Sequence, residues 1–270
     1  MRGANLRPPA ALAGVGRQPI TERDRRILAF AAEQRFVLGA HIASLLGIST
    51  PAASARLEAL YEAGYMTGAD LFTGEPPYYR VRTAGLRAIG SDLPRPRTVD
   101  PSVYRHDAGL AWLTVAAERG TFGPLTEIIS ERRMRSEDWR EGDRDRPFGV
   151  RLGGVGRDGR PRLHYPDLVV VTDTGHRVAF ELELTTKAPR SRERILAAYA
   201  ADQGIDAVVY LVDTPARRRA MEDSVRRVGI GDRVRVERVT VGHRPGAPAP
   251  ASRALQRSVH RGAKTSGASR

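Results

Sequence analysis

The sequence predicts an α+β fold of two domains, an N-terminal helical domain that ends in a hairpin and a C-terminal α/β domain. Helical periodicity dominates residues 20–63, and two short strand-like runs follow it. From about residue 163 onward, valine-rich strand-like runs alternate with helical segments. A chain of 270 residues can bury the cores of two modest domains, although one large domain is also possible at this length.

The N-terminal domain is predicted to begin after a stretch rich in proline, glycine and alanine, residues 1–19, which we expect to be disordered. Thr21 and Asp24 have the spacing of a capping box, so the first helix should begin there and run to about Gln34. A second, short helix should stop at Gly47, because glycine favours the left-handed conformation at a helix end.

A third helix and a hairpin complete this domain. Thr50 followed by Pro51 is typical of an N-cap and the first helical position. Two short strands, 64–66 and 78–81, then enclose a loop that contains glycine and proline. Three helices followed by a hairpin are the order of a winged helix-turn-helix, which we assign to residues 20–90.

The second domain is predicted to follow a linker at 91–103 and to cover residues 104–239. Besides a central hairpin, its expected elements are helices at 105–119, 190–203 and 215–228 and strands at 207–212 and 233–239. The GGVGRDG run at 153–159 has a dinucleotide-binding spacing, but a strand rather than a helix follows it. We therefore interpret this run as a surface turn.

Composition excludes several classes of protein. The chain contains no cysteine, which rules out disulfides, thiolate metal sites and a cysteine nucleophile. Its longest apolar runs are far shorter than the roughly 20 residues that span a bilayer, and its N-terminus lacks the apolar stretch of a signal peptide. These features predict a cytoplasmic protein with no membrane partner.

The formal net charge is +13, and the last part of the chain contributes strongly to it. Residues 240–270 contain arginines and a lysine but no acid, and small residues and proline fill the rest, so we expect a disordered basic tail. Such a tail strengthens non-specific contact with nucleic acid phosphates. The alternative is a solvated terminus of an arginine-rich chain.

The third helix, residues 51–63, is the candidate for reading DNA, because this helix enters the major groove in a helix-turn-helix. Arg56 is expected to point outward, where a guanidinium can donate two hydrogen bonds to guanine. The arginines of the second wing strand should hold phosphates. The residues predicted to contact double-stranded DNA are Thr50, Ser54, Arg56, Arg80 and Arg82. Glu58 and Glu62 on the same helix favour an alternative, in which the domain binds a protein.

The stretch PDLVVVTDTGHRVAFELELTTK, residues 166–187, predicts two strands joined by a turn. A three-residue turn at 174–176 would make the numbers of cross-strand partners sum to 350 and place Asp167 opposite Glu183. Because side chains alternate along each strand, Glu181 joins these two acids on one face while aliphatic side chains share the other. A half-buried sheet resists a register that mixes the two sets.

Three carboxylates on one face repel one another unless a cation or a basic group offsets them. Oxygen ligands suit Mg²⁺ or Mn²⁺, and such an ion could polarise a scissile phosphate and activate water. We expect Asp167 and Glu181 to bind the metal, Glu183 to orient the water and Lys187 to stabilise charge on the phosphate. The alternative is a strand pair whose outer face carries solvated acids.

Other ionisable residues lack the spacing of a metal site. The histidines, His164 among them, are scattered and should be structural or exposed. Glu127 and Glu131 precede the hairpin and could supply a further ligand from a helix, although a solvated face is the simpler interpretation.

The pair Pro166-Asp167 and the triplet Glu181-Leu182-Glu183 resemble the PD-(D/E)xK nuclease superfamily. This resemblance implies a restriction-endonuclease-like α/β core, with the acids on two adjacent strands and helices on both sides. Residue 183 is Glu where the superfamily usually has Lys. Lys187 would therefore have to reach the site from beyond the strand end.

A longer resemblance covers about residues 20–239. The runs TERDRRILAFAAEQRFVLGAHIASLLG, ARLEALYEAGYM, YYRVRTAGLRAIG and PDLVVVTDTGHRVAFELELTT, in this order, resemble the replication-relaxation family of actinobacterial plasmids and integrative elements. This resemblance implies a DNA-binding protein that acts in replication, relaxation or mobilisation, with other replication or mobilisation proteins as possible partners. An active metal-dependent DNA endonuclease or nickase and a winged-helix transcriptional regulator are the alternatives.

Overall fold

The structure is a computed structural model that describes residues 5–6, 20–141 and 147–240. Apart from residues 5–6 and Thr240, the tails predicted to be disordered lie outside this described part. The described elements combine helices with antiparallel and parallel strands, which confirms the α+β class. Within the same ranges, no helix is both long and apolar enough to cross a bilayer.

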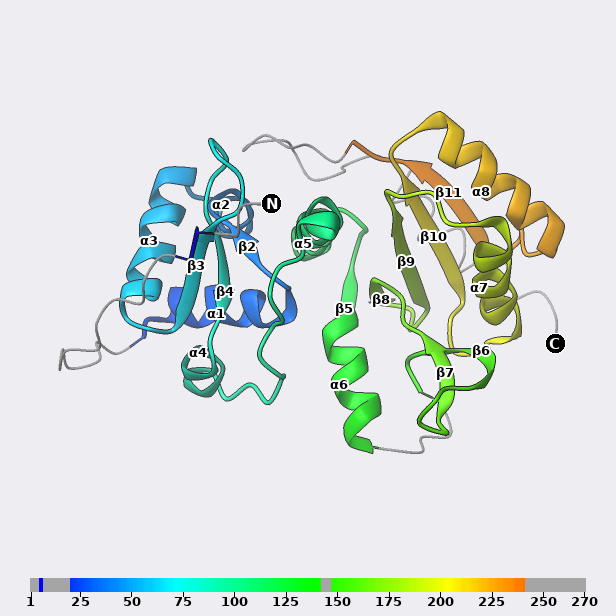
Figure 1. Cartoon of the computed structure of the whole chain (residues 1–270), viewed down its shortest axis with the longest axis horizontal. Helices are drawn as coiled ribbons and strands as arrows, with labels where there is room; N and C mark the ends of the chain where they lie inside the picture. The colour runs from blue at the N-terminus through cyan, green and yellow to red at the C-terminus, as the bar shows by residue number, and fades with distance from the viewer. Residues whose placement is uncertain (1–4, 7–19, 142–146, 241–270) are drawn as a thin grey trace. The chain divides into compact units, whose positions relative to one another are not determined.

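The chain divides into two compact units, between Val115 and Ala116 in the sequence. The first unit contains β1 (Asn5–Leu6), α1 (Glu22–Glu33), β2 (Val37–Leu38), α2 (Gly39–Leu46), α3 (Thr50–Glu62), β3 (Met66–Asp70), β4 (Tyr78–Val81), α4 (Thr83–Ala88), a 3₁₀ turn (Pro101–Val103) and most of α5 (Tyr104–Glu118). Its sheet has the strand order β1-β3-β4-β2 (Figure 1).

The predicted boundary signals of the first helices are largely confirmed. The Thr21 hydroxyl accepts a hydrogen bond from the Asp24 N–H at 3.2 Å, and the Asp24 carboxylate accepts one from the Thr21 N–H at 2.9 Å, so the capping box forms. Gly47 ends α2 with a φ of 67°. The N-cap of α3 is Ser49, one residue before the predicted Thr50, which is the first helical residue.

The segment predicted as a linker, 91–103, packs within the first unit. Two carbonyl groups of this segment, those of Pro96 and Arg97, accept hydrogen bonds from the buried Arg80 guanidinium. Val99 belongs to an apolar cluster with Phe36. This segment is therefore held against the rest of the first unit rather than forming a free spacer.

The Asp24 carboxylate also joins α1 to α3. Arg56 donates to both carboxylate oxygens of Asp24, which is fully buried. Burial opposes ionisation of Asp24, but the hydrogen bonds from Arg56 and Thr21 outweigh it and lower the pKa of the carboxyl group. One side chain thus caps α1 and neutralises the arginine of α3.

His41 of α2 is fully buried beside α5. Its Nδ1 accepts a hydrogen bond from the Leu38 N–H at 3.1 Å, and its ring meets that of Trp112 edge to face at 4.7 Å. Burial disfavours the charged imidazolium and lowers the pKa of His41 to about 3. The ring is therefore neutral at physiological pH.

The second unit contains the end of α5, β5 (Leu125–Ser130), α6 (Glu131–Glu141), β6 (Val150–Val155), β7 (Pro161–His164), β8 (Leu168–Thr172), β9 (Arg177–Glu183), α7 (Pro189–Ala201), β10 (Ala207–Val212), α8 (Pro215–Val228) and β11 (Val234–Arg238). Its main sheet has the order β11-β10-β9-β8-β5, with β9, β10 and β11 parallel and the β5, β8 and β9 neighbours antiparallel (Figure 1). Strands β6 and β7 form a separate hairpin.

Helices α7 and α8 cover one face of the main sheet (Figure 1). Leu196 and Tyr199 of α7 and Met221 of α8 pack with Ala179 of β9 and Val208 of β10 in one buried cluster. Because side chains alternate along paired strands, this covered face is also the face of Glu181.

The predicted register of the central hairpin is wrong by two residues. Leu168 lies opposite Phe180, so partner numbers sum to 348 rather than 350. The turn consists of residues 173–175, and Gly175, with a φ of 84°, is its last residue rather than its middle one. Three-residue hairpin loops place the left-handed residue last, which fixes this register. Both sums are even, so the sorting of side chains between the two faces is unchanged.

Two elements before the hairpin were not predicted. Glu127 lies exposed on strand β5, which corrects its expected place on a helix. Glu131 opens α6 and pairs with Arg135 at 2.7 Å. The glycine run 153–159 spans the end of β6 and the following turn, which confirms its interpretation as a surface turn.

We expect Asp24→Ala to lower the free energy of unfolding of the first unit by about 2 kcal/mol, because it removes the cap of α1 and the partner of Arg56. Urea unfolding followed by Trp112 fluorescence in a Trp139→Phe background measures this change. Glu22→Ala, at an exposed acid in the same helical turn, is the control and should change stability by less than about 0.5 kcal/mol. Equal effects of the two variants would contradict the role of Asp24.

The pKa of His41 predicts a pH dependence of stability. Between about pH 3 and 6.5 the unfolded chain binds a proton at His41 that the folded chain excludes, so acidification should destabilise the first unit by up to roughly 1.4 kcal/mol per pH unit. Urea unfolding between pH 5 and 7, followed by Trp112 fluorescence, tests this slope. His41→Gln should flatten it, and an unchanged slope in that variant would show that other groups cause it.

Candidate functional site

The predicted carboxylates converge where β8 begins and β9 ends. Asp167 immediately precedes β8, and its N–H donates to the Phe180 carbonyl of β9 at 3.1 Å, which holds Asp167 beside the end of β9. An Asp167 carboxylate oxygen accepts a hydrogen bond from the Leu182 N–H at 2.7 Å. With Glu183 two residues beyond Glu181, all three acids lie on one face of the sheet.

This acidic cluster, Asp167, Glu181 and Glu183, is largely withdrawn from water. Glu181 is 3% exposed and Glu183 5% exposed, while Asp167 is half-buried. The interpretation of these residues as a solvated outer face is therefore wrong. The reason is that α7 packs over the face on which they lie, with Tyr199 in the same buried cluster as Ala179 of β9.

Glu181 is held by aromatic residues from neighbouring elements. Its Oε1 accepts a hydrogen bond from the hydroxyl of the fully buried Tyr199 of α7, and it contacts His164 Nε2 at the end of β7 at 2.6 Å. Tyr210 of β10 lies opposite Glu181 in the sheet. Burial, reinforced by the negative charge of Glu181, raises the pKa of both tyrosines well above the usual value, so both stay protonated.

His164 contacts the cluster through Glu181. Burial alone would lower its pKa, but the charge of Glu181 and the hydrogen bond to it outweigh burial and raise the pKa above its ordinary value. His164 also meets the Tyr199 ring edge to face at 6.0 Å. The side chain that scattered spacing predicted to be structural or exposed is thus a partner of the acidic cluster.

Lys187 lies beyond the end of β9, and its side chain reaches back to the last residue of that strand. Its Nζ lies 2.8 Å from Glu183 Oε2, and its side chain is 40% exposed. Burial of the amine is outweighed by Glu183 and the other two acids, so the pKa of Lys187 is raised and the ammonium stays charged. The second oxygen of Glu183, Oε1, is buried without a hydrogen-bond partner in the described structure.

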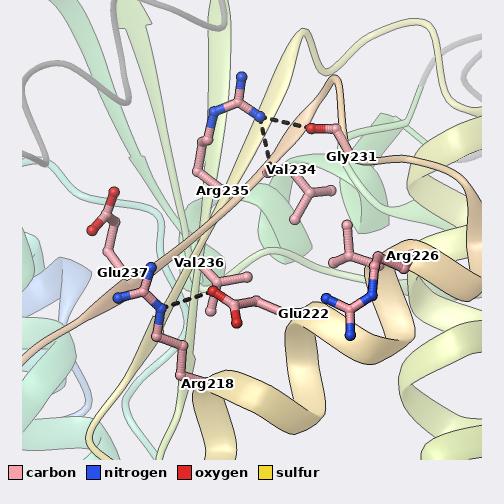
Figure 2. A pocket seen from close by; sticks show the side chains of 9 residues that line it. Arg218, Glu222, Arg226, Gly231, Val234, Arg235, Val236 and Glu237 are labelled. Atoms are coloured by element: carbon pink, nitrogen blue, oxygen red, sulfur yellow. Dashed lines mark hydrogen bonds and ion pairs between the residues drawn. The ribbon is translucent and has the colours of Figure 1, made fainter. Parts of the chain in front are cut away.

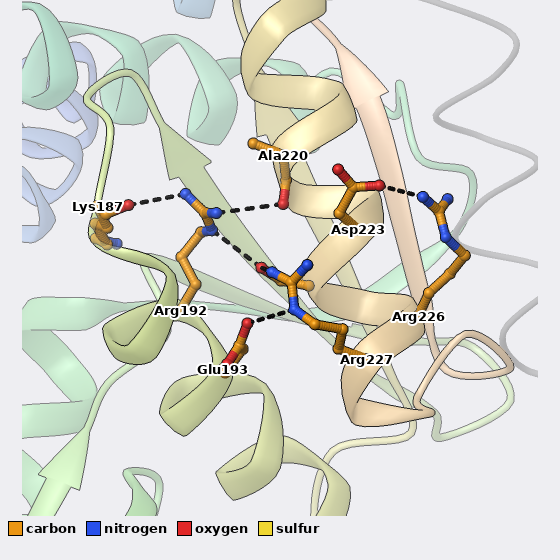
Figure 3. A network of polar contacts seen from close by, with 8 residues as sticks. Lys187, Arg192, Glu193, Ala220, Asp223, Arg226 and Arg227 are labelled. Atoms are coloured by element: carbon orange, nitrogen blue, oxygen red, sulfur yellow. Dashed lines mark hydrogen bonds and ion pairs between the residues drawn. The ribbon is translucent and has the colours of Figure 1, made fainter.

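The backbone of Lys187 is fixed separately from its side chain. The buried Arg192 of α7 donates to the Lys187 carbonyl at 2.8 Å, and it also donates to Ser224 and to the Ala220 carbonyl of α8, each at 3.3 Å (Figure 3). The same network extends to Arg227, which pairs with Glu193 at 2.7 Å. This network ties the segment after β9 to both helices.

The donor set suits a hard divalent cation in part. Carboxylate oxygens are the ligands that Mg²⁺ and Mn²⁺ prefer, and Glu183 Oε1 is a buried acceptor with no donor of its own. Glu181 Oε1, in contrast, is engaged by Tyr199 and His164. Across residues 20–141 and 147–240, no three acidic or histidine side chains are already grouped as a metal site. Asp167 and Glu183 are therefore better placed than the predicted pair Asp167 and Glu181.

Sequence reasoning missed two members of this site. Tyr199 shows no signal except its place on the buried stripe of α7, and its contact with a carboxylate of β9, 18 residues earlier in the chain, has no local pattern. His164 lies three residues before Asp167, so its proximity to the hairpin was visible in the sequence. Its distance from any other histidine in the sequence concealed this role, because a contact with a single carboxylate leaves no ligand spacing.

Several residues predicted to contact DNA have structural partners instead. The prediction that Arg56 points outward is corrected, because its guanidinium is paired with Asp24. Arg80 is 7% exposed and hydrogen-bonded to backbone carbonyls, and burial lowers its pKa. Ser54 packs against Gly39, where any Cβ atom would collide with the serine hydroxyl.

The other two predicted contacts lie at helix starts. Thr50 is the first residue of α3, and Arg82 is the N-cap residue of α4; both are half-buried. The exposed surface of α3 near its start is formed by Pro51, Ala52 and Ala55, which carry no charge. A DNA contact through this helix would therefore depend on shape and backbone rather than on a guanidinium.

A separate shallow pocket of about 300 Å³ lies between α8 and the edge strand β11 (Figure 2). Arg218 pairs with Glu222 across its wall at 2.8 Å, and Arg235 donates to the carbonyls of Gly231 and Val234. None of the predicted site residues lines this pocket. Arg226, also on its lining, pairs with Asp223 of α8, and we assign the pocket no chemistry.

Comparisons of the chain with protein-family models, curated proteins and solved structures give no match. The geometry of the acidic cluster therefore carries the functional argument.

Substitutions of Tyr199 and Glu181 should have coupled effects on the free energy of unfolding, because the two side chains share a hydrogen bond. Tyr199→Phe removes a donor to a buried carboxylate, so we expect it to lower the free energy of unfolding of the second unit by about 2 kcal/mol. In a Glu181→Gln background the same change should cost at least about 1 kcal/mol less, because the charge that the hydroxyl stabilises is absent. Chemical unfolding of the four proteins measures this cycle, and additive effects would contradict the contact.

Proposed function

We propose that this protein acts on the DNA of a plasmid or integrative element, in replication, relaxation or mobilisation, and that its acidic cluster cleaves or nicks DNA with a divalent cation. The observation that carries the proposal is the state of the two carboxylate oxygens of Glu183, on the sheet face that bears Asp167. One oxygen is buried without a hydrogen-bond partner, and the Lys187 ammonium contacts the other. Structural cores rarely leave a buried carboxylate oxygen without a donor, whereas a cation site requires one.

The order of elements supports the finer fold proposals. In the first unit, three helices are followed by the antiparallel pair β3 and β4, the arrangement expected for a winged helix-turn-helix. In the second unit, the acids lie at the adjacent ends of β8 and β9, and α7 follows directly. This is consistent with a PD-(D/E)xK core. The order of the motifs that resemble the replication-relaxation family supports the mobile-element context.

Asp167 and Glu183 would hold Mg²⁺ or Mn²⁺. When bound, such an ion would polarise the scissile phosphate and make water more acidic. Lys187, with an exposed side chain and a charged ammonium, would offset negative charge that builds on the phosphate. Glu181 would act at one remove, because Tyr199 and His164 fix its carboxylate and thereby the end of β9.

A second function is favoured by one observation, the engagement of Glu181 Oε1 by two donors. If this arrangement persists on DNA, the second unit would bind without cleaving and the protein would be a DNA-binding factor. If the protein is a nuclease, loss of Asp167 should abolish DNA cleavage. If it is a DNA-binding factor, there is no cleavage to lose and DNA binding should be unchanged.

Incubation of supercoiled plasmid with purified protein and Mg²⁺ or Mn²⁺ distinguishes them. We expect conversion to open-circular or linear DNA, abolished by chelation and reduced roughly a hundredfold or more by Asp167→Ala and by Glu183→Gln. Asp173→Ala, at an exposed acid in the turn of the same hairpin, is the matched control and should cleave normally.

Binding is measured in parallel by gel shift with the same variants. A protein that shifts DNA but leaves supercoiled, linear and branched substrates intact with each cation, and whose binding is unchanged by Asp167→Ala, would refute the nuclease proposal and support the second function.

A further inference from the structure

The β6–β7 hairpin is a strongly basic and exposed element of the second unit. Its guanidinium groups belong to Arg151, Arg157, Arg160 and Arg162, all exposed. Asp158 at the turn is its one acid, and this carboxylate accepts a hydrogen bond from the backbone N–H of Arg160. Among the described residues, no carboxylate forms a salt bridge with any of the four guanidinium groups. The hairpin therefore presents uncompensated positive charge to solvent.

An exposed tryptophan lies beside this hairpin. Trp139 of α6 is 70% exposed, and the Arg160 guanidinium lies over its ring, 4.4 Å from the centroid. The neighbouring Asp138 carboxylate accepts hydrogen bonds from the N–H groups of Phe148 and Gly149 at 2.9 and 3.1 Å, which fixes the chain entering β6 to α6. The tryptophan and the arginine hairpin thus form one surface, with an open aromatic face.

The hairpin ends at the acidic cluster. His164, the last residue of β7, contacts Glu181 at 2.6 Å. Arg162 lies two residues earlier on the same strand and so projects from the same face as His164, roughly 7 Å away along the strand. The positive charge of the hairpin therefore leads directly to the carboxylates.

We propose that this hairpin surface, formed by Trp139, Arg157, Arg160 and Arg162, binds an unpaired DNA strand and directs its phosphates toward Asp167 and Glu183. The inference rests on the proposed function, whose substrate it specifies. Arginines neutralise the phosphates, and a base stacks on the free face of Trp139.

The combination of groups favours a single strand over other partners. A base inside a duplex is already stacked on both sides, so an exposed tryptophan gains little from duplex DNA. An acidic protein would match the charge of the arginines, but its carboxylates would not stack on the exposed face of the Trp139 ring as a base does.

Tryptophan fluorescence tests the inference directly. The chain has two tryptophans, and Trp112 is buried in the first unit, so Trp112→Phe leaves Trp139 as the reporter. In EDTA, where cleavage cannot occur, (dT)₁₂ should quench this emission. The full-length wild type, corrected with the spectrum of Trp139→Phe, provides the same signal if Trp112→Phe folds poorly.

Stacking on Trp139 and phosphate contacts of the arginines are distinguished by different changes in (dT)₁₂ binding. Trp139→Ala should weaken (dT)₁₂ binding roughly 5- to 100-fold, as expected for loss of one stacked base. Arg157→Ala and Arg162→Ala should weaken binding and each reduce the slope of log affinity against log salt by about 0.7. Arg219→Ala, at an exposed arginine of α8, is the matched control and should bind normally.

Several outcomes would overturn the inference. These are quenching by a 12-base-pair duplex at lower concentration than by (dT)₁₂, quenching by an acidic peptide but not by DNA, and DNA binding that leaves Trp139 emission and the hairpin variants unaffected. Its failure is distinguishable from failure of the proposed function. Quenching by a wild-type protein that cleaves no DNA with Mg²⁺ or Mn²⁺ refutes only the nuclease, whereas cleavage that is unchanged in Trp139→Ala at subsaturating DNA refutes only the hairpin surface.

Discussion

The second unit depends on the burial of two carboxylates beneath a helix. Taking Glu181 and Glu183 out of water is costly, and each is stabilised by a donor from another part of the chain: Tyr199 and His164 for the first, Lys187 for the second. These contacts bring β7, α7 and the segment after β9 to the same end of the sheet. The charged cluster is therefore also the place where the elements of the unit are held in register.

The first unit solves a similar problem with different residues. Asp24 is buried and neutralised by Arg56, and the Arg80 guanidinium is buried against carbonyl groups. These two arginines were predicted to contact DNA because arginine on a helix or a hairpin strand usually faces solvent. In a chain in which arginine greatly outnumbers lysine, guanidinium groups also perform the structural pairing of the core.

Patterns of a few consecutive residues predicted much of the fold. The features that the sequence did not predict depend on contacts between residues of different elements or on elements too short for a pattern. The capping box at Thr21, the glycine after α2 and the alternation of β8 and β9 are properties of a few consecutive residues, and each led to an element at or near its predicted place. The short elements β2 and α4 lack enough residues for a periodic pattern. The side chains that complete the acidic cluster, Tyr199 and His164, come from other elements, and only the packing of α7 and β7 brings them together.

The role of Arg192 has a consequence for how this site can change over evolutionary time. Because Arg192 anchors the carbonyl of residue 187, the path of the main chain there is independent of which side chain that residue carries. Arg192 thus fixes the position of the main chain, whereas residue 187 supplies the ammonium group. Descendants of this protein could replace the ammonium by a neutral group, or restore it, through single substitutions that leave the surrounding architecture intact, so that the charge at this position can be lost and regained without passing through an unfolded ancestor.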